Sequence, residues 1–173
     1  MSPTNDVEIR RARAGDLRAI PAELGDQEFF ADRVARQDDG RGVLLLALSG
    51  GLPVGTVYLW RERADEQEVR DHLPEVPLLN HVEVLAGHRN QLVGTRLVSE
   101  AERILAGFGH DQVALAVNVD NTNAERLYKR LGYQRWEHDT LICWAEVKQP
   151  DGTRKTCPET CYMLVKALPG SSA

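Results

Sequence analysis

The spacing of apolar and polar positions along the chain predicts strands and amphipathic helices in a mixed order. Five segments have the apolar runs or the alternation that strands show: 7–13, 43–49, 54–63, 78–86 and 112–119. Four segments have the apolar spacing of helices: 14–20, 26–37, 93–108 and 122–131. Asp16 is the expected N-cap of the first helix. Asn121 or Thr122 begins the last helix, and Glu125 lies at capping-box spacing from Thr122.

The last part of the chain predicts a long hairpin. Residues 133–147 and 155–168 are two strand-like runs, and the Pro-Asp-Gly sequence between them is a turn signal. Because a helix joins strands 78–86 and 112–119, we expect a right-handed parallel crossover between them. The remaining strands are expected to be antiparallel. The sequence therefore predicts an α+β fold around one mixed sheet.

Length and composition are those of an ordinary globular protein. The chain has 173 residues, of which 42% are hydrophobic and 27% are charged. We expect one domain over residues 1–173, with a core at 7–168 and loose tails at 1–6 and 169–173. The formal net charge of −5 argues against a nucleic-acid partner, which usually requires a basic excess.

Neither a membrane nor a metal is indicated. No apolar run approaches the roughly 18 residues that a membrane span needs, and the first residues lack the apolar centre of a signal peptide. A cytoplasmic protein without a membrane partner is therefore expected. Cys143, Cys157 and Cys161 lack a fourth ligand at metal spacing, so we interpret them as structural thiols and expect no metal.

Residues 88–97, HRNQLVGTRL, have the features of an anion-binding helix start. The first N–H groups of a helix have no intrahelical partner, and this end carries about half a positive charge. Arg89 stands just before the predicted helix, and the backbone from Asn90 to Thr95 could donate to a pyrophosphate. A plain turn between strand and helix is the alternative.

Two further groups of polar residues lie close to this turn in the predicted fold. His81 and Glu83 share one face of strand 78–86, and an ionisable group is unfavourable in a sheet interior unless it is paired or functional. Tyr128 lies on the apolar face of the helix that follows Asn121. The structural alternatives are a salt bridge for Glu83, core packing for Tyr128 and a helix cap for Asn121.

The segment from residue 78 to residue 135 resembles the core of the GCN5-related N-acetyltransferases. That family has an Arg/Gln-x-x-Gly-x-Gly/Ala loop, followed by a strand and an N-x-x-A-x-x-L-Y-x-x-x-G-Y/F stretch. The matching positions are Arg89, Gly94, Asn121, Ala124, Leu127, Tyr128, Gly132 and Tyr133. One position departs, because Leu92 replaces the first glycine of the loop. Either φ stays negative at Leu92, with its side chain directed away, or the affinity for the cofactor is reduced.

The resemblance implies an acetyl-CoA-dependent N-acetyltransferase with the acyl-CoA N-acyltransferase fold. Tyr128 would protonate the departing sulfur, and Glu83, His81 or a water chain would accept the proton of the amine. Main-chain groups near Val84 would hold the thioester carbonyl and the pantetheine arm between two diverging strands. The expected cofactor contacts are Val82, Val84, Arg89, Asn90, Gln91, Leu92, Val93, Gly94, Thr95, Asn121 and Ala124.

The amine acceptor, a small molecule or a peptide, is expected on the side of the two early helices. The connection 64–77 is acidic there, which favours a cationic amine, although a solvated surface explains the charges equally well. Trp136 and Trp144 could line this pocket, form an interface or pack in the core. The closing hairpin could also pair two copies into a homodimer. A non-catalytic acyl-CoA-binding or protein-interaction module of the same fold is the alternative function.

Overall fold

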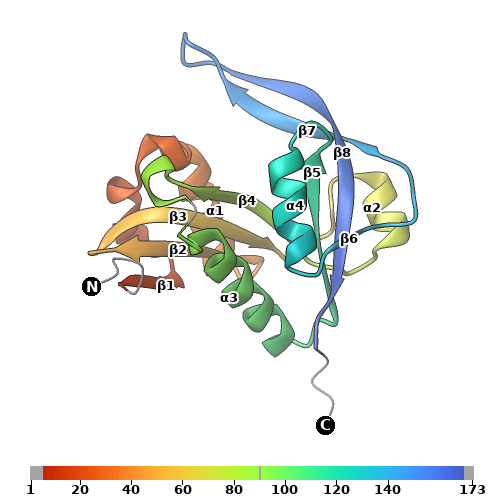
Figure 1. Ribbon diagram of the computed structural model, residues 1–173. Helices are drawn as coiled ribbons and strands as arrows, with labels where there is room; N and C mark the ends of the chain where they lie inside the picture. Colours follow the sequence, from red (N-terminus) through yellow and green to blue (C-terminus); the bar gives the residue numbers. More distant parts are fainter. Residues whose placement is uncertain (1–5, 90, 170–173) are drawn as a thin grey trace.

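A computed structural model describes residues 6–89 and 91–169. Within them, one mixed sheet has the strand order β1-β2-β3-β4-β5-β8-β6, and β7 pairs with β8 outside that order (Figure 1). The strands are β1 Val7–Arg11, β2 Gly42–Ser49, β3 Leu52–Trp60, β4 Leu78–Val84, β5 Gln112–Asn118, β6 Gln134–Arg135, β7 Leu141–Lys148 and β8 Arg154–Ala167. Among the described strands, only β4 and β5 are paired in parallel. The predicted mixed sheet with a parallel crossover is confirmed.

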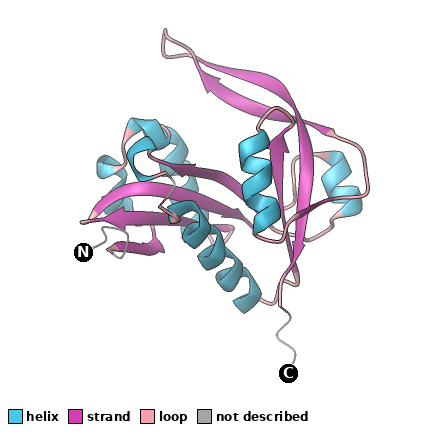
Figure 2. Cartoon of the chain, in the orientation of Figure 1, coloured by secondary structure: helices cyan, strands magenta, loops and turns pink. Residues whose placement is uncertain are grey.

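Helices cover both faces of the sheet (Figure 2). The α-helices are α1 Gln27–Asp38, α2 Gln67–His72, α3 Val93–Gly107 and α4 Thr122–Arg130, and the short 3-10 helices are η2 Ala14–Ala19, η3 Ala22–Leu24 and η4 Ala86–His88. Helices α3 and α4 pack on one apolar cluster, while α1, α2 and the residues around η2 and η3 pack on another. The part of the chain that the structure describes contains no helix long and apolar enough to cross a membrane.

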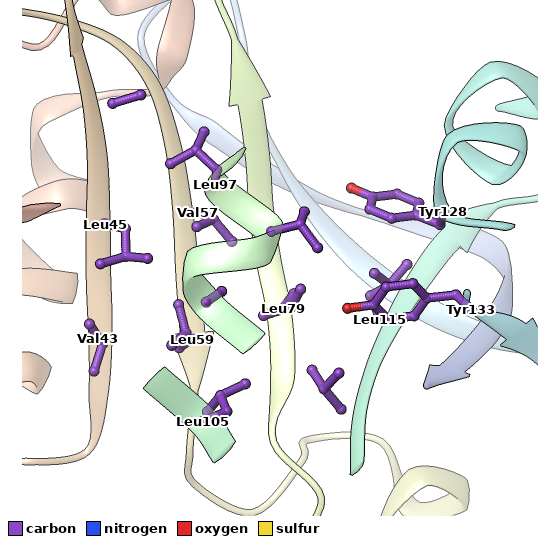
Figure 3. Close-up of a cluster of buried hydrophobic side chains, with 14 of the residues drawn as sticks. Val43, Leu45, Val57, Leu59, Leu79, Leu97, Leu105, Leu115, Tyr128 and Tyr133 are labelled. Carbon is purple, nitrogen blue, oxygen red and sulfur yellow. The ribbon is translucent and has the colours of Figure 1, made fainter. Parts of the chain in front are cut away.

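The core explains why the most strongly periodic segment is the longest helix. Along α3 the buried positions are Val93, Leu97, Val98, Ala101 and Leu105, which recur at steps of three and four. These side chains pack against β2 and β3, where Leu45, Val57 and Leu59 are almost completely buried (Figure 3). Burial of each such side chain contributes about 1.5–3 kcal/mol, so this face fixes α3 against the sheet.

Three local predictions are wrong. Asp16 is not an N-cap: it lies in the first turn of η2, where its carboxylate accepts the Arg13 N–H at 2.7 Å and pairs with Arg10. The connection 64–77 contains α2, which buries Val69 alone and so gives no periodic signal. The first strand of the closing hairpin is interrupted: after the Trp136 N–H donates to the Met163 carbonyl of β8, residues 137–140 form no strand before β7 begins.

Candidate functional site

Strands β4 and β5 diverge, and this opens the centre of the sheet. Their only residue pair in the described chain is Leu78 with Ala114. Beyond it, β4 stays paired with β3 as far as Val84, and β5 stays paired with β8 as far as Asn118. The facing edges of β4 and β5 therefore carry backbone donors and acceptors that no described strand pairs. Such edges can accept an extended ligand as an additional strand.

The start of α3 lies next to the end of β4. Leu92 adopts φ 64° and ψ 13°, in the left-handed region, and Val93 begins the helix. Of the two alternatives for Leu92, the negative φ is not observed, although its side chain does point outward, with 69% of its surface exposed. The first i to i−4 bond runs from Arg96 N–H to the Leu92 carbonyl. A left-handed residue followed by helical ones aims successive N–H groups into a concavity that suits an anion.

Gly94 keeps the surface of this turn open. Among the described residues, a Cβ at this position would meet only Val84 Cγ2, at 3.8 Å, which is an ordinary contact. Packing within the protein therefore does not require glycine here, although glycine lowers helix propensity by about 1 kcal/mol relative to alanine. A ligand that approaches the main chain closely at this turn would explain why the position is a glycine.

The remaining residues expected at the phosphate loop surround this turn. Arg89 is exposed, and its Nε donates to the Val84 carbonyl at 3.1 Å, which fixes the guanidinium beside the end of β4. Val93 is buried under the helix start, and Gln91 and Thr95 are half-buried. Asn90 lies outside the described residues. A cationic side chain and free helix N–H groups thus meet at one place.

Tyr128 comes from the opposite side of the divergence. Only 7% of its surface is exposed, and Figure 3 shows its hydroxyl directed toward β4 and α3. Burial, together with the negative charge of Glu83, raises the pKa of Tyr128 to about 12. The phenol therefore stays protonated at neutral pH and can act as a proton donor.

Glu83 is an exposed residue of β4 with no ion pair among the described residues. The alternative of a salt bridge to a neighbouring arginine is therefore not observed. Its negative charge adds to burial in raising the pKa of Tyr128. Val82 and Val84, on either side of Glu83, pack against the cluster beneath α3.

His81 lies in the same strand but has different contacts. Its Nε2 hydrogen-bonds the Leu24 carbonyl, and its ring centroid lies 4.3 Å from that of Phe29. The imidazole is thus directed toward η3 and α1. The His81 side chain is thus directed away from Tyr128, toward another element.

Asn121 is a helix cap, which was the structural alternative for this residue. Its Oδ1 accepts the Ala124 N–H at 3.2 Å and caps α4. Ala124 is partly buried against the cluster beneath α3 and α4. Glu125 does not form the capping box with Thr122, because its carboxylate binds Arg135 through two hydrogen bonds of 2.6 and 2.9 Å.

One group near Tyr128 escaped the sequence interpretation. Glu102 of α3 accepts a hydrogen bond from the Tyr133 hydroxyl and another from Lys166 Nζ, both at 2.8 Å. The Tyr133 ring packs edge-on against Tyr128, with centroids 5.7 Å apart. Burial and the Glu102 charge raise the pKa of Tyr133 strongly. Glu102 could have been found from its spacing, since it follows Val98 by one helical turn on the apolar face.

The remaining candidates lie elsewhere. Trp136 is half-buried and donates from Nε1 to the Asp139 carbonyl at 3.0 Å, whereas Trp144 has 64% of its surface exposed, so core packing is wrong for Trp144. Cys143 and Cys161 are free thiols whose pKa values are raised by burial. No cluster of three or more possible metal ligands occurs in the described ranges.

Comparison with known proteins identifies the family and the fold. The profile of the Acetyltransferase (GNAT) family matches residues 8–133. A search of curated proteins finds no match. Solved structures share the fold, including the PaiA N-acetyltransferase of Thermoplasma acidophilum in complex with coenzyme A (TM-score 0.67, 16% identity, covering 96% of this chain and 99% of that one).

Two other solved structures are also similar to this chain. The ribosomal-protein-S18-alanine N-acetyltransferase of Escherichia coli has a TM-score of 0.65 and 16% identity, covering 96% of this chain and 98% of its own. NAA60 of Arabidopsis thaliana, in complex with a bisubstrate analogue, has a TM-score of 0.66 and 22% identity, covering 95% and 99%. The fold is that of the acyl-CoA N-acyltransferases. The chain belongs to the GNAT acetyltransferase family.

Proposed function

We propose that the protein transfers an acetyl group from acetyl-CoA to a primary amine by direct attack. The observation that carries the proposal is the divergence of β4 and β5, with the buried Tyr128 on one side and the open start of α3 near Gly94 on the other. The site combines a buried phenol that stays protonated with a carboxylate and main-chain edges that have no ion-pair or strand partner among the described residues. Acyl transfer from a thioester requires groups of these kinds.

The phosphate and pantetheine groups would be held mainly by backbone atoms. The N–H groups at the start of α3 and the guanidinium of Arg89 would hold the pyrophosphate. The unpaired edge of β4 near Val84 would hold the pantetheine amides and the thioester carbonyl. Acetyl-CoA supplies the activated acetyl group, and the protein supplies its orientation.

The proton transfers are assigned to two side chains. An alkylammonium titrates near pH 10, so the attacking amine must lose a proton before it can react. We assign this proton to Glu83, directly or through water. Its carboxylate has no ion-pair partner in the described chain, and its charge contributes to the raised pKa of Tyr128. Tyr128 then protonates the sulfur, whose conjugate acid titrates only near about 8.5.

The remaining parts of the proposal concern the acceptor and the surroundings. The acceptor is a small molecule or a peptide with a primary amine, which the acidic segment 64–77 would attract. Acceptance of a protein N-terminus agrees with the reaction that the name of the Escherichia coli structure describes. We also propose a cytoplasmic location, and a homodimer formed through the exposed hairpin of β7 and β8.

Calorimetric titration with acetyl-CoA, followed by thiol-release assays with a panel of amines, tests the function. Gly94→Val should lower the affinity by about tenfold or more, because its methyl groups would occupy the ligand side of the turn. Gly107→Val is the matched control: it makes the same change at the other end of α3, where a Cβ meets nothing within 4 Å. Absence of binding at millimolar acetyl-CoA would exclude the proposal, and binding without turnover would indicate the non-catalytic module.

A further inference from the structure

Strand β4 contains a bulge at His81. Thr56 and Tyr58, two residues apart on β3, pair with Glu83 and Asn80, three residues apart on β4. His81 has φ 55°, in the left-handed region that this kind of bulge usually fills with glycine. The Thr56 hydroxyl donates to the His81 carbonyl at 3.1 Å and holds the bulge in place. Strain retained at one residue suggests that the side chain has a task that glycine could not perform.

The His81 imidazole connects the bulge to the segment before α1. Its Nε2 must carry the proton, since the Leu24 carbonyl can only accept a hydrogen bond. The ring packs on Phe29 and meets Phe30 edge-on, with centroids 5.7 Å apart. At Gly25, where φ is 150°, a Cβ would lie 2.9 Å from His81 Nε2. The turn between η3 and α1 is thus built closely around this imidazole.

The contact between His81 and Leu24 lies on the side from which the amine would reach Glu83. Val82 and Val84 face the cluster under α3, so the alternation of the strand directs Glu83 to the opposite face. The cluster that includes Leu24 and Phe30 lies on that opposite face. An amine that approaches Glu83 from this side would pass residues 21–27, the acceptor-side segment. The acetyl-CoA contacts described above lie at the start of α3, on the other face.

We propose that His81 is a positioning residue that holds the acceptor-side segment against β4 and so determines how well the amine is bound. The inference rests on the proposed function, because it assumes that the amine reaches Glu83. The proton on Nε2 is already used in the hydrogen bond to the Leu24 carbonyl, and the imidazole packs against Phe29 and Phe30. His81 therefore acts through the segment that it holds rather than as the general base.

Two substitutions separate the side chain from the backbone. His81→Gly removes the imidazole but favours the positive φ, so the bulge should be retained. His81→Gln keeps an N–H donor at nearly the same reach. With His81→Gly, we expect the KM for the amine to rise about tenfold, the factor that corresponds to roughly one hydrogen bond and its packing. The kcat and the KM for acetyl-CoA should stay within about twofold, and His81→Gln should recover most of the loss.

Amide hydrogen exchange gives a second readout that does not require turnover. In His81→Gly, residues 21–27 should exchange faster than in the wild type, while α3 should be unchanged. Unaltered exchange and an unaltered KM for the amine would overturn the proposal. A collapse of kcat in His81→Gln, with loss of the fall in rate at low pH, would also overturn it, because His81 would then be the general base. If the wild type turns over no amine, the proposed function fails, and unchanged exchange would still refute the positioning role.

Discussion

The left-handed conformation of Leu92 leads to a quantitative prediction. A residue with a side chain at φ 64° is disfavoured by about 1–2 kcal/mol relative to the right-handed region. Glycine avoids this strain but loses about 0.5–1 kcal/mol through its greater freedom in the unfolded chain. Leu92→Gly and Leu92→Ala both lack the leucine side chain and differ only in this backbone preference. We therefore expect Leu92→Gly to be more stable than Leu92→Ala by about 0.5–1 kcal/mol.

Urea unfolding at equilibrium measures this difference. With a slope of about 2 kcal/mol per molar urea, the midpoint of Leu92→Gly should exceed that of Leu92→Ala by about 0.2–0.5 M, with equal slopes. The wild type retains the strain but also buries about a third of the leucine, which has 69% of its surface exposed. Its midpoint should therefore lie within about 0.5 M of both variants.

The affinity for acetyl-CoA provides the second half of this test. Because the turn already has the left-handed conformation, Leu92→Gly should leave the affinity unchanged within about threefold, or tighten it, by calorimetry. Equal midpoints, or a higher midpoint for Leu92→Ala, would mean that residue 92 does not hold a positive φ in solution. A marked loss of affinity would mean that the leucine side chain itself contributes to the site.

Three further predictions concern ionisable groups. Tyr128→Phe should lower kcat by about 10²-fold or more and leave the KM for acetyl-CoA within about twofold; an unchanged rate would leave Tyr128 a packing role only. Glu83→Gln should lower the pKa of Tyr128 from about 12 but keep it above its usual value, since burial is the larger cause; ultraviolet titration against a Tyr128→Phe reference detects this. Arg135 lowers the pKa of Glu125, so this pair stabilises the fold above about pH 4.3 and ceases to do so as pH falls through the lowered value. Glu125→Gln should therefore lower stability by about 1–2 kcal/mol at pH 7 and progressively less on acidification, as measured by urea unfolding.

The long periodic segments were predictable because their signal is local. Helix α3, strand β5 and the start of α4 at Asn121 follow from apolar spacing and one cap. Helix α2 was missed because a six-residue helix with one buried side chain has no period to detect. The gap between β6 and β7 was missed because Trp136 continues the apolar pattern of a strand, while the interruption falls on the polar residues after it.

The site was predictable only in part, for a related reason. Residue spacing predicts that Tyr128 lies on the apolar face of its helix and that a helix begins next to Gly94, because both features depend on neighbours in sequence. The bulge at His81 depends on the register between β3 and β4, which no pattern within β4 alone reveals. The left-handed φ of Leu92 likewise opposes the preference of a leucine, so local propensity predicts the wrong conformation.

The divergence of β4 and β5 has a consequence for how the family evolves. Under the proposed function, the cofactor is recognised mainly through main-chain N–H and C=O groups, which every residue except proline supplies alike. Side chains along these edges are then free to drift while the ligand is retained. Such freedom agrees with a fold that is shared over 96% of this chain at only 16% sequence identity. Many side chains near the site could therefore be substituted so that the enzyme accepts a different amine while it still binds the acyl donor.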